Sequence, residues 1–343
     1  MAYTTIDDPS AYFQVLTYTG NGSNPRNLTN DGNSDLQPDL YWYKTRSSSN
    51  YHYLADSSRG TTKYIYPNDS LAEGTVASAY VQSFDTNGVT LGGGDSGTNT
   101  NGTTFANWVW KANGGTNQGS NYQVNTTSGF SIGTYTGNRA SVVTANHGLG
   151  AKLDFLLIKP TSAVGPWVAW HKSDPTKVMF LDTTDAAFGY GAYFDAAPNT
   201  NTSSFSVGDA GATNAAGVTY LFYGFAEKQG YSKFGKYVGN GNANGSFVYT
   251  GFKPEFVIVK RSDSANNWII TDNARGINGA NPRLYADLTA AEGSAADYID
   301  HLSNGFKIRT SAGSMNTSGG TYIYMAFAEN PFVTSTGIPA TAR

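Results

Sequence analysis

The stretch Leu16-Thr-Tyr-Thr-Gly-Asn-Gly22 decides how this chain is divided, because it occurs three times. It returns as Gly133-Thr-Tyr-Thr-Gly-Asn138 and as Gly235-Lys-Tyr-Val-Gly-Asn-Gly241. Each copy places a run of alternating β-type residues directly before a Gly-Asn turn, a pattern typical of a β-hairpin. Three copies at intervals of domain size indicate one module that is used three times.

The repeat continues beyond this turn. In each copy a strand follows that reads as buried and ends in lysine: Asp39-Leu-Tyr-Trp-Tyr-Lys44, Asp154-Phe-Leu-Leu-Ile-Lys159 and Glu255-Phe-Val-Ile-Val-Lys260. From that lysine to the aligned aromatic residue of the closing strand there are 66 residues (Lys44 to Trp110), 66 (Lys159 to Phe225) and 67 (Lys260 to Phe327). A spacing this constant, with so little sequence identity, indicates a duplicated fold.

The composition favours sheets joined by tight turns. Gly (40), Tyr (23) and Phe (18) are abundant, and charged residues make up only 14% of the 343 residues. We therefore predict an all-β protein of three tandem antiparallel β-sandwich domains, jelly-roll-like and derived from the internal repeat. The predicted units are 1–115 (unit one), 116–229 (unit two) and 230–332 (unit three), each large enough for its own core, with a C-terminal tail at 333–343.

Two smaller structural predictions accompany this division. The segment 113–121 is rich in Gly and Asn and is predicted to be a flexible linker between units one and two. Helix is expected only as single turns at Ser70–Gly74 and Thr289–Gly293, at matching places in units one and three.

Charge and hydropathy limit the partners. The net charge is −3 and the 22 basic residues are dispersed, so we expect no nucleic-acid partner. No apolar run approaches the ~18 residues of a membrane span, and we expect no membrane insertion. The chain has no cysteine and its first residues do not read as a signal peptide, so we expect synthesis and folding in a reducing cytoplasm.

The sequence offers no catalytic, metal or cofactor motif, and we predict none of these sites. The four histidines lie at non-equivalent positions of the repeat and are expected to be structural: His52, His147, His171 and His301. Asp31-Gly-Asn-Ser-Asp35 has oxygen side chains at alternate positions, as a calcium loop does. It lacks the glycine at the bend and the final glutamate, so a simple loop turn is favoured.

Several polar residues recur between copies and are expected to hold the module together. They are Lys44, Lys159 and Lys260 at the strand ends, and the pairs Asp56 with Arg59 and Asp272 with Arg275. Each Asp-Arg pair is predicted to form an ion pair that braces the following turn. Unit two has His171-Lys-Ser-Asp174 at this place and must brace its turn differently.

Most aromatic residues lie in alternating strands and are expected in the core. The exception is the glycine-spaced segment Phe188-Gly-Tyr-Gly-Ala-Tyr-Phe194 of unit two, which unit three lacks. Because insertions on a repeated scaffold often carry function, Tyr190, Tyr193 and Phe194 are the candidates for contact with a ligand or partner.

The repeated sequence segments resemble β-rich modules of bacteriophage virion proteins, often labelled tail fibre or tail-associated, from marine phages and cyanophages. The resemblance is carried by the Tyr-Thr-Gly-Asn-Gly opening, Gln37-Pro-Asp-Leu-Tyr-Trp-Tyr-Lys44, the Asp-x-x-Arg-Gly tail, Ala72-Glu-Gly74, the closing Phe-Ala-Glu and the ending Ile338-Pro-Ala-Thr-Ala-Arg343. It implies a non-enzymatic structural protein of the virion, and a tail fibre or appendage that contacts the host surface is favoured. The implied partners are other virion proteins, further copies in a homo-oligomer, and a glycan or protein of the host surface.

Two alternatives remain open. The first is a decoration or adaptor protein of the capsid or neck. The second, from another class, is a depolymerase of surface glycans, which would need a pair of carboxylates in a groove. No Asp/Glu pair is singled out by its sequence context.

Overall fold

The computed structural model describes residues 2–76, 80–93, 97–118, 121–140, 142–276, 278, 282–293 and 298–340. The structure is nearly all β, with 42% strands and 5% helix, and the strands form several antiparallel sheets. The predicted all-β class is therefore confirmed. The division into three tandem domains and its boundaries stay a prediction.

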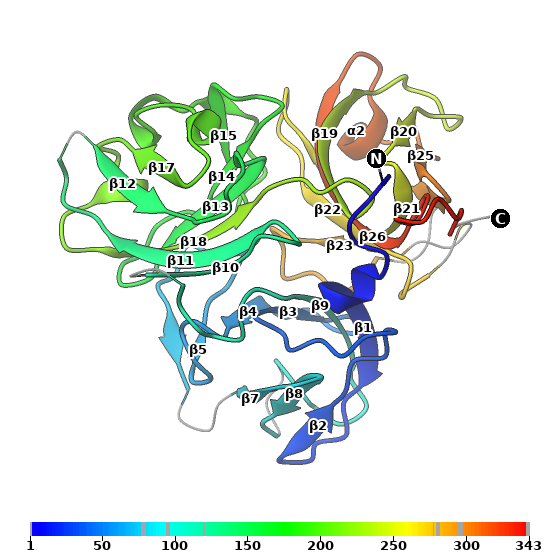
Figure 1. Cartoon of the computed structure of the whole chain (residues 1–343), viewed down its shortest axis with the longest axis horizontal. Coiled ribbons are helices and arrows are strands. Elements are labelled where there is room, and N and C mark those ends of the chain that lie inside the picture. Colours follow the sequence, from blue (N-terminus) through cyan, green and yellow to red (C-terminus); the bar gives the residue numbers. More distant parts are fainter. Residues whose placement is uncertain are drawn as a thin grey trace.

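Three main sheets take their strands from successive parts of the chain (Figure 1). The first has the order β1 (Phe13–Thr19), β9 (Thr104–Trp110), β3 (Leu40–Thr45) and β4 (His52–Asp56). The second has the order β10 (Tyr122–Asn125), β11 (Phe130–Thr136), β18 (Thr219–Phe225), β13 (Phe155–Pro160), β14 (Val168–His171), β15 (Lys177–Phe180) and β16 (Phe188–Gly189). The third has the order β19 (Ser232–Val238), β26 (Thr321–Pro331), β21 (Phe252–Arg261), β22 (Trp268–Asp272) and β23 (Leu284–Tyr285).

Smaller sheets accompany each main sheet. They are β2 (Arg26–Leu28), β8 (Gly88–Leu91) and β7 (Val81–Asp85); β12 (Val143–Asn146) and β17 (Ser204–Val207); β20 (Phe247–Tyr249), β25 (Gly305–Ile308) and β24 (Ile299–Leu302); and the pair β5 (Lys63–Tyr64) and β6 (Gly74–Thr75). The helical elements are single turns: η1 (Pro9–Ala11), η2 (Gly191–Tyr193), η3 (Pro198–Thr200), α1 (Gly211–Asn214) and α2 (Gly313–Asn316). None of the helices in the described ranges has the length and apolar character needed to cross a membrane.

The lysine-ended strands are apolar throughout because both of their faces are buried. In β3, Leu40 and Trp42 face one hydrophobic core, whereas Tyr41 and Tyr43 face another. Neighbouring residues of a strand point to opposite faces, so a sheet between two cores needs an uninterrupted apolar run. The strands β13 and β21 show the same division.

The two faces lead to two kinds of core. Three hydrophobic clusters each belong to one unit. A further cluster takes residues from all three main sheets, among them Trp108, Tyr223 and Phe327. The units are thus not separate domains that have only their own cores. Each main sheet buries its second face against the other two main sheets.

The opening Tyr-x-Gly-Asn stretch is not a hairpin turn, so that prediction is wrong. β1 pairs with β9, and the chain then enters β2 in the smaller sheet. Tyr18 donates a hydrogen bond to the carbonyl of Thr98 (2.5 Å), and the Asn21 N–H donates to the side chain of Asn99 (3.0 Å). The same amide bond recurs from Asn138 to Asn214 (2.9 Å) and from Asn240 to Asn316 (2.8 Å). The stretch is therefore the end of a strand, and a hydrogen bond to a residue far along the chain holds it in place.

The repeated lysines join the units in a ring. Each is fully buried and donates to a loop carbonyl of another unit: Lys44 to Thr289 (3.3 Å), Lys159 to Ser70 (2.9 Å) and Lys260 to Thr184 (3.0 Å). The bonds run from unit one to three, two to one and three to two, so they close a cycle. The helical turns predicted at Ser70–Gly74 and Thr289–Gly293 are wrong, because residues 70–73 and 289–292 have no regular secondary structure, Gly74 begins β6 and Gly293 forms an isolated β-bridge with Arg283. The carbonyls of Ser70 and Thr289 serve as acceptors.

The two repeated Asp-Arg pairs form as predicted. Arg59 Nε lies 2.6 Å from Asp56 Oδ2, and Arg275 Nε lies 2.7 Å from Asp272 Oδ2. In unit two, the Nδ1 atom of His171 accepts a hydrogen bond from the Ser173 N–H (3.1 Å). An imidazole thus braces the turn that the carboxylate braces in the other units.

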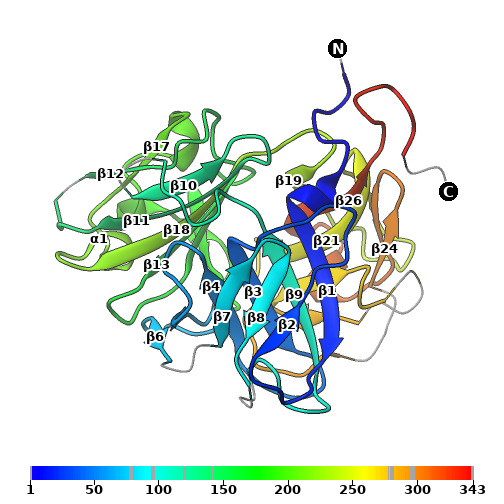
Figure 2. The ribbon, with the colours of Figure 1, turned by 60° about the horizontal axis from the view of Figure 1, so that its bottom comes forward.

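The N-terminal segment contacts unit three and the C-terminal tail. Tyr3 donates a hydrogen bond to the carbonyl of Gly251 (2.7 Å), and the Ser335 N–H donates to Asp7 (2.6 Å). The first and the last described residues consequently lie on the same side of the molecule (Figure 2).

Candidate functional site

The segment Phe188–Phe194 forms β16 and η2 on one side of unit two. Phe194 is 1% exposed and packs in the unit-two core, so its expected ligand contact does not fit the structure. Tyr190 and Tyr193 are half-buried against the same core, and the Tyr193 ring lies edge-on to Phe188 at 5.7 Å. A ligand contact by the two tyrosines stays a prediction.

All four histidines are buried, with at most 5% of any of them exposed. Burial lowers the pKa of His171 to about 3 and the pKa of His147 to about 4, so both are neutral at pH 7. His301 hydrogen-bonds the Pro254 carbonyl through Nδ1 at 3.0 Å. These positions fit the structural role expected of them. Within the described ranges, no three His, Asp or Glu side chains are grouped as metal ligands.

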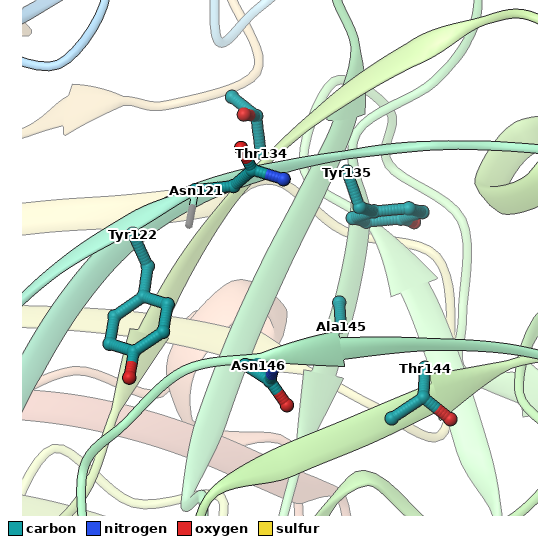
Figure 3. Close-up of a pocket in the computed structure, with 7 residues that line it drawn as sticks. All are labelled: Asn121, Tyr122, Thr134, Tyr135, Thr144, Ala145 and Asn146. Atoms are coloured by element: carbon teal, nitrogen blue, oxygen red, sulfur yellow. The ribbon is translucent and has the colours of Figure 1, made fainter. Parts of the chain in front are cut away.

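The best candidate site is a pocket in unit two (Figure 3). There β10 covers the outer edge of β11, whereas β1 and β19, the equivalent strands of the other units, are themselves edge strands. The pocket lies between the β10–β11 pair and β12 and has a volume of about 90 Å³. It is lined by Asn121, Tyr122, Thr134, Tyr135, Thr144, Ala145 and Asn146, and we call it the unit-two pocket.

The lining of the unit-two pocket is polar and uncharged. Among the described residues that form it there is no Asp, Glu, Lys, Arg or His. Asn121 and Asn146 are exposed, and their side-chain amides make no hydrogen bond to another described residue. The hydroxyl of Tyr135 is instead used within the fold, because it donates a hydrogen bond to the Thr213 carbonyl at 2.7 Å. The two amides are therefore the groups most available to a ligand.

The ring of Tyr122 lies close against a glycine. Gly148 has a φ of +65°, and a Cβ atom on it would lie 2.3 Å from the Tyr122 ring. The ring is half-buried and lies on one side of the opening, with Tyr135 on the other side (Figure 3). Gly148 is needed both for its backbone conformation and for the room it leaves to this ring.

The other units present different side chains at the place of β12. The pairs Ala145 with Phe205, Leu28 with Val89 and Val248 with Phe306 align the three strands. Thr144 and Asn146 then correspond to Asn27 and Thr29 in unit one and to Phe247 and Tyr249 in unit three. The unit-three aromatics are 47% and 53% exposed. One scaffold thus carries three different surfaces at equivalent positions.

A second pocket, of about 160 Å³, lies between units one and three and is acidic. It is lined by Ser10, Gln14, Asp31, Gly32, Asn33, Glu255, Glu329 and Asn330. Burial raises the pKa of Glu255 well above 4.5, and the carboxylate of Glu329 adds to this shift. Glu329 is paired with Lys253 at 2.7 Å. The acidic pocket therefore combines a carboxyl that favours its proton with a carboxylate that is ion-paired with Lys253.

Glu255 departs from the repeat. The equivalent Asp39 and Asp154 accept backbone hydrogen bonds from the chain that follows the closing strand, from Ala112 and Glu227 respectively, each at 2.6 Å. Glu255 is one methylene longer and accepts from the Val15 N–H of unit one at 3.2 Å. It is the carboxyl that the depolymerase alternative would require as a general acid.

Sequence comparison places the chain in a family. The family model described as Domain of unknown function (DUF7483) matches residues 8–331. The chain belongs to this family. The match spans all three main sheets, so the domain that defines the DUF7483 family contains the three units together, in agreement with their shared core. No curated protein and no solved structure matches the chain.

The unit-two pocket could not be read from the sequence. The residues that open it, Asn121 and Tyr122, stand at the end of a segment that composition marks as a linker. The described part of that segment is held by Gln123, whose Oε1 accepts the N–H groups of Asn113 (2.9 Å) and Gly115 (3.1 Å). The short alternating run Tyr122-Gln-Val-Asn125 was the available signal of an extra strand.

Proposed function

We propose that this protein is a non-enzymatic structural component of a bacteriophage particle, and that its favoured role is a tail fibre or appendage that contacts the host surface. The resemblance of its repeated sequence segments to phage virion modules supports this proposal. The single observation that carries the surface contact is the unit-two pocket, whose described lining residues are uncharged and offer free amides but no acid, base or nucleophile pair.

The way the units are joined also supports a structural role. The cycle of buried lysines and the shared core tie the three sheets into one body. A body of this kind holds its pockets and exposed side chains at constant distances from one another. This is what a particle component needs if it is to bind neighbouring proteins on one side and a surface on another.

The proposed partners are other virion proteins, further copies of this chain in a homo-oligomer, and a glycan or protein of the host surface. The protein would be made in the host cytoplasm and act in the virion. Light scattering on the purified chain tests the oligomer directly, because a mass equal to one chain of 36.5 kDa would contradict it.

Binding to whole host cells tests the favoured role. We expect the purified protein to bind cells and to be displaced by surface polysaccharide from the same host. Binding to empty capsids without any binding to cells would favour the decoration or adaptor role instead. An averaged image of the particle that places the protein on the capsid or neck would lead to the same conclusion.

The acidic pocket favours one second candidate, the glycan depolymerase. Its Glu255 would donate a proton to the leaving oxygen, and Glu329 would act as the partner carboxylate. The measurement is the release of reducing ends from host polysaccharide by the wild type and by Glu255→Gln. A release that the wild type shows and the variant loses would establish the enzyme and overturn the non-enzymatic proposal.

A further inference from the structure

We infer that the unit-two pocket binds one residue of a neutral sugar. The inference rests on the proposed function for its biological meaning, since it names the chemistry by which the protein would contact a host surface. It rests on the structure for the site itself.

The charge of the pocket selects the ligand class. A phosphate or carboxylate site uses Arg, Lys or clustered N–H groups, and a cation site uses carboxylates. The described residues that line the pocket supply neither kind of side chain. An amide side chain carries both donors and an acceptor, which matches a hydroxyl group that donates one hydrogen bond and accepts others. Asn121 and Asn146 therefore suit a ligand rich in hydroxyl groups.

The aromatic residue adds the second feature of sugar recognition. Tyr122 presents a half-buried ring on one side of the opening, and this ring lies close against Gly148. A sugar ring has an apolar face of C–H groups and a rim of hydroxyls. A rigid aromatic ring next to free amides contacts both parts at little cost in side-chain entropy.

The size of the pocket sets the extent of binding. A volume of about 90 Å³ is well below the roughly 300–1,000 Å³ of pockets that enclose a drug-sized ligand. Only part of one sugar residue enters, and the rest of a glycan chain stays outside. We expect a dissociation constant on the order of 1–10 mM for a monosaccharide, which repeated copies on a particle would strengthen by multivalency.

The comparison between units makes the site specific to unit two. At the equivalent place in unit one, the guanidinium of Arg26 lies 4.9 Å from the ring centre of Tyr18, the counterpart of Tyr135. In unit three the strand turns Phe247 and Tyr249 outward instead of small polar side chains. A substitution in unit one or three therefore serves as a matched control within the same chain.

The test is saturation-transfer NMR on the full chain with glucose, galactose, mannose and N-acetylglucosamine, and with inorganic phosphate as the charged comparison. We expect at least one neutral sugar to receive saturation and phosphate not to compete with it. Asn146→Ala and Tyr122→Leu should each weaken binding between about threefold and tenfold. Asn27→Ala, at the unit-one position equivalent to Thr144, should bind as the wild type does. Thermal unfolding of each variant shows that it is folded.

Two results would overturn the inference: no saturation of any neutral sugar by the wild type, or equal binding by the wild type and both pocket variants. Binding to host cells separates this inference from the proposed function. Cell binding without sugar binding would overturn the sugar site and leave the host contact supported. Sugar binding without cell binding would support the site and count against the host contact.

Discussion

The indole N–H of Trp108 donates a 2.8 Å hydrogen bond to Oδ2 of Asp272, although 164 residues separate the two side chains. The same oxygen accepts Nε–H of Arg275 at 2.7 Å. The equivalent carboxylate of unit one, Asp56, accepts a 2.8 Å bond from the hydroxyl of Tyr223. The aspartate that braces a turn within its own unit is thus also the acceptor by which a neighbouring unit is attached.

Replacing Trp108 tests the strength of this attachment. Trp108→Phe removes the bond to a buried carboxylate, and we expect the hydrogen-bond part of the loss to be about 1.5–3 kcal/mol of unfolding free energy. Trp110→Phe is the matched control, because Trp110 is equally buried and its Nε1 has no hydrogen-bond partner among the described residues. The measurement is urea unfolding of both variants, and equal losses would show that the bond to Asp272 contributes nothing.

The shared core predicts how the whole chain unfolds. If each main sheet buries one face against the other two, losing one unit exposes apolar surface of the remaining pair. We expect one calorimetric transition, with a calorimetric enthalpy close to the van't Hoff enthalpy. Independent domains on a flexible linker would give two or three transitions, and that result would contradict the shared core.

The register of the repeat could be predicted from sequence, and the assembly of the units could not. Leu40, Phe155 and Phe256 pair with Trp110, Phe225 and Phe327, which agrees with the counts of 66, 66 and 67 residues from the lysines. A strand that is buried on both faces can be recognised in the sequence by its uninterrupted apolar run. The same run does not say which face meets its own small sheet and which meets another unit, since both faces are equally apolar.

The opening stretch and the pocket show the limits of local patterns. A Gly-Asn pair after a strand suits both a hairpin and a strand exit, and what decides is contact with a distant residue. In unit one, a Cβ on Gly20 would lie 2.0 Å from the carbonyl oxygen of Thr100, 80 residues later. The pocket likewise depends on Tyr122 meeting Gly148, a contact that composition cannot reveal.

The contact between Gly148 and Tyr122 gives a further prediction. Gly148→Ala places a Cβ where the Tyr122 ring lies and strains a backbone with φ +65°. Gly150→Ala meets the same strain at φ +66° with open space around it, so it is the matched control. We expect both to lose roughly 1 kcal/mol from strain and Gly148→Ala to lose more. Only Gly148→Ala should change the NMR signals of the Tyr122 ring. Equal stability and unchanged ring signals would contradict the assigned contact.

The buried lysines predict that the protein gains stability in mild alkali. Burial lowers the pKa of Lys44, Lys159 and Lys260 from 10.5 to about 8. Between these values the unfolded chain keeps protons that the folded chain has released, so the free energy of unfolding rises with pH. Above about pH 10 the gain ends, because buried tyrosines such as Tyr41 and Tyr43 have raised pKa values and ionise only on unfolding.

Urea unfolding at several pH values between 7.5 and 9.5 measures this rise. Each lysine contributes up to one proton taken up on unfolding, so Lys159→Met should remove about a third of the pH dependence. It should also lower stability at every pH, because the carbonyls of Ser70 and Gly165 lose the hydrogen bonds that Lys159 donates. Lys236→Met, which removes a 53% exposed lysine, should leave the pH dependence as in the wild type. A flat or falling stability over this range would mean that the ring lysines keep their protons in the fold, held by the carbonyls they bridge.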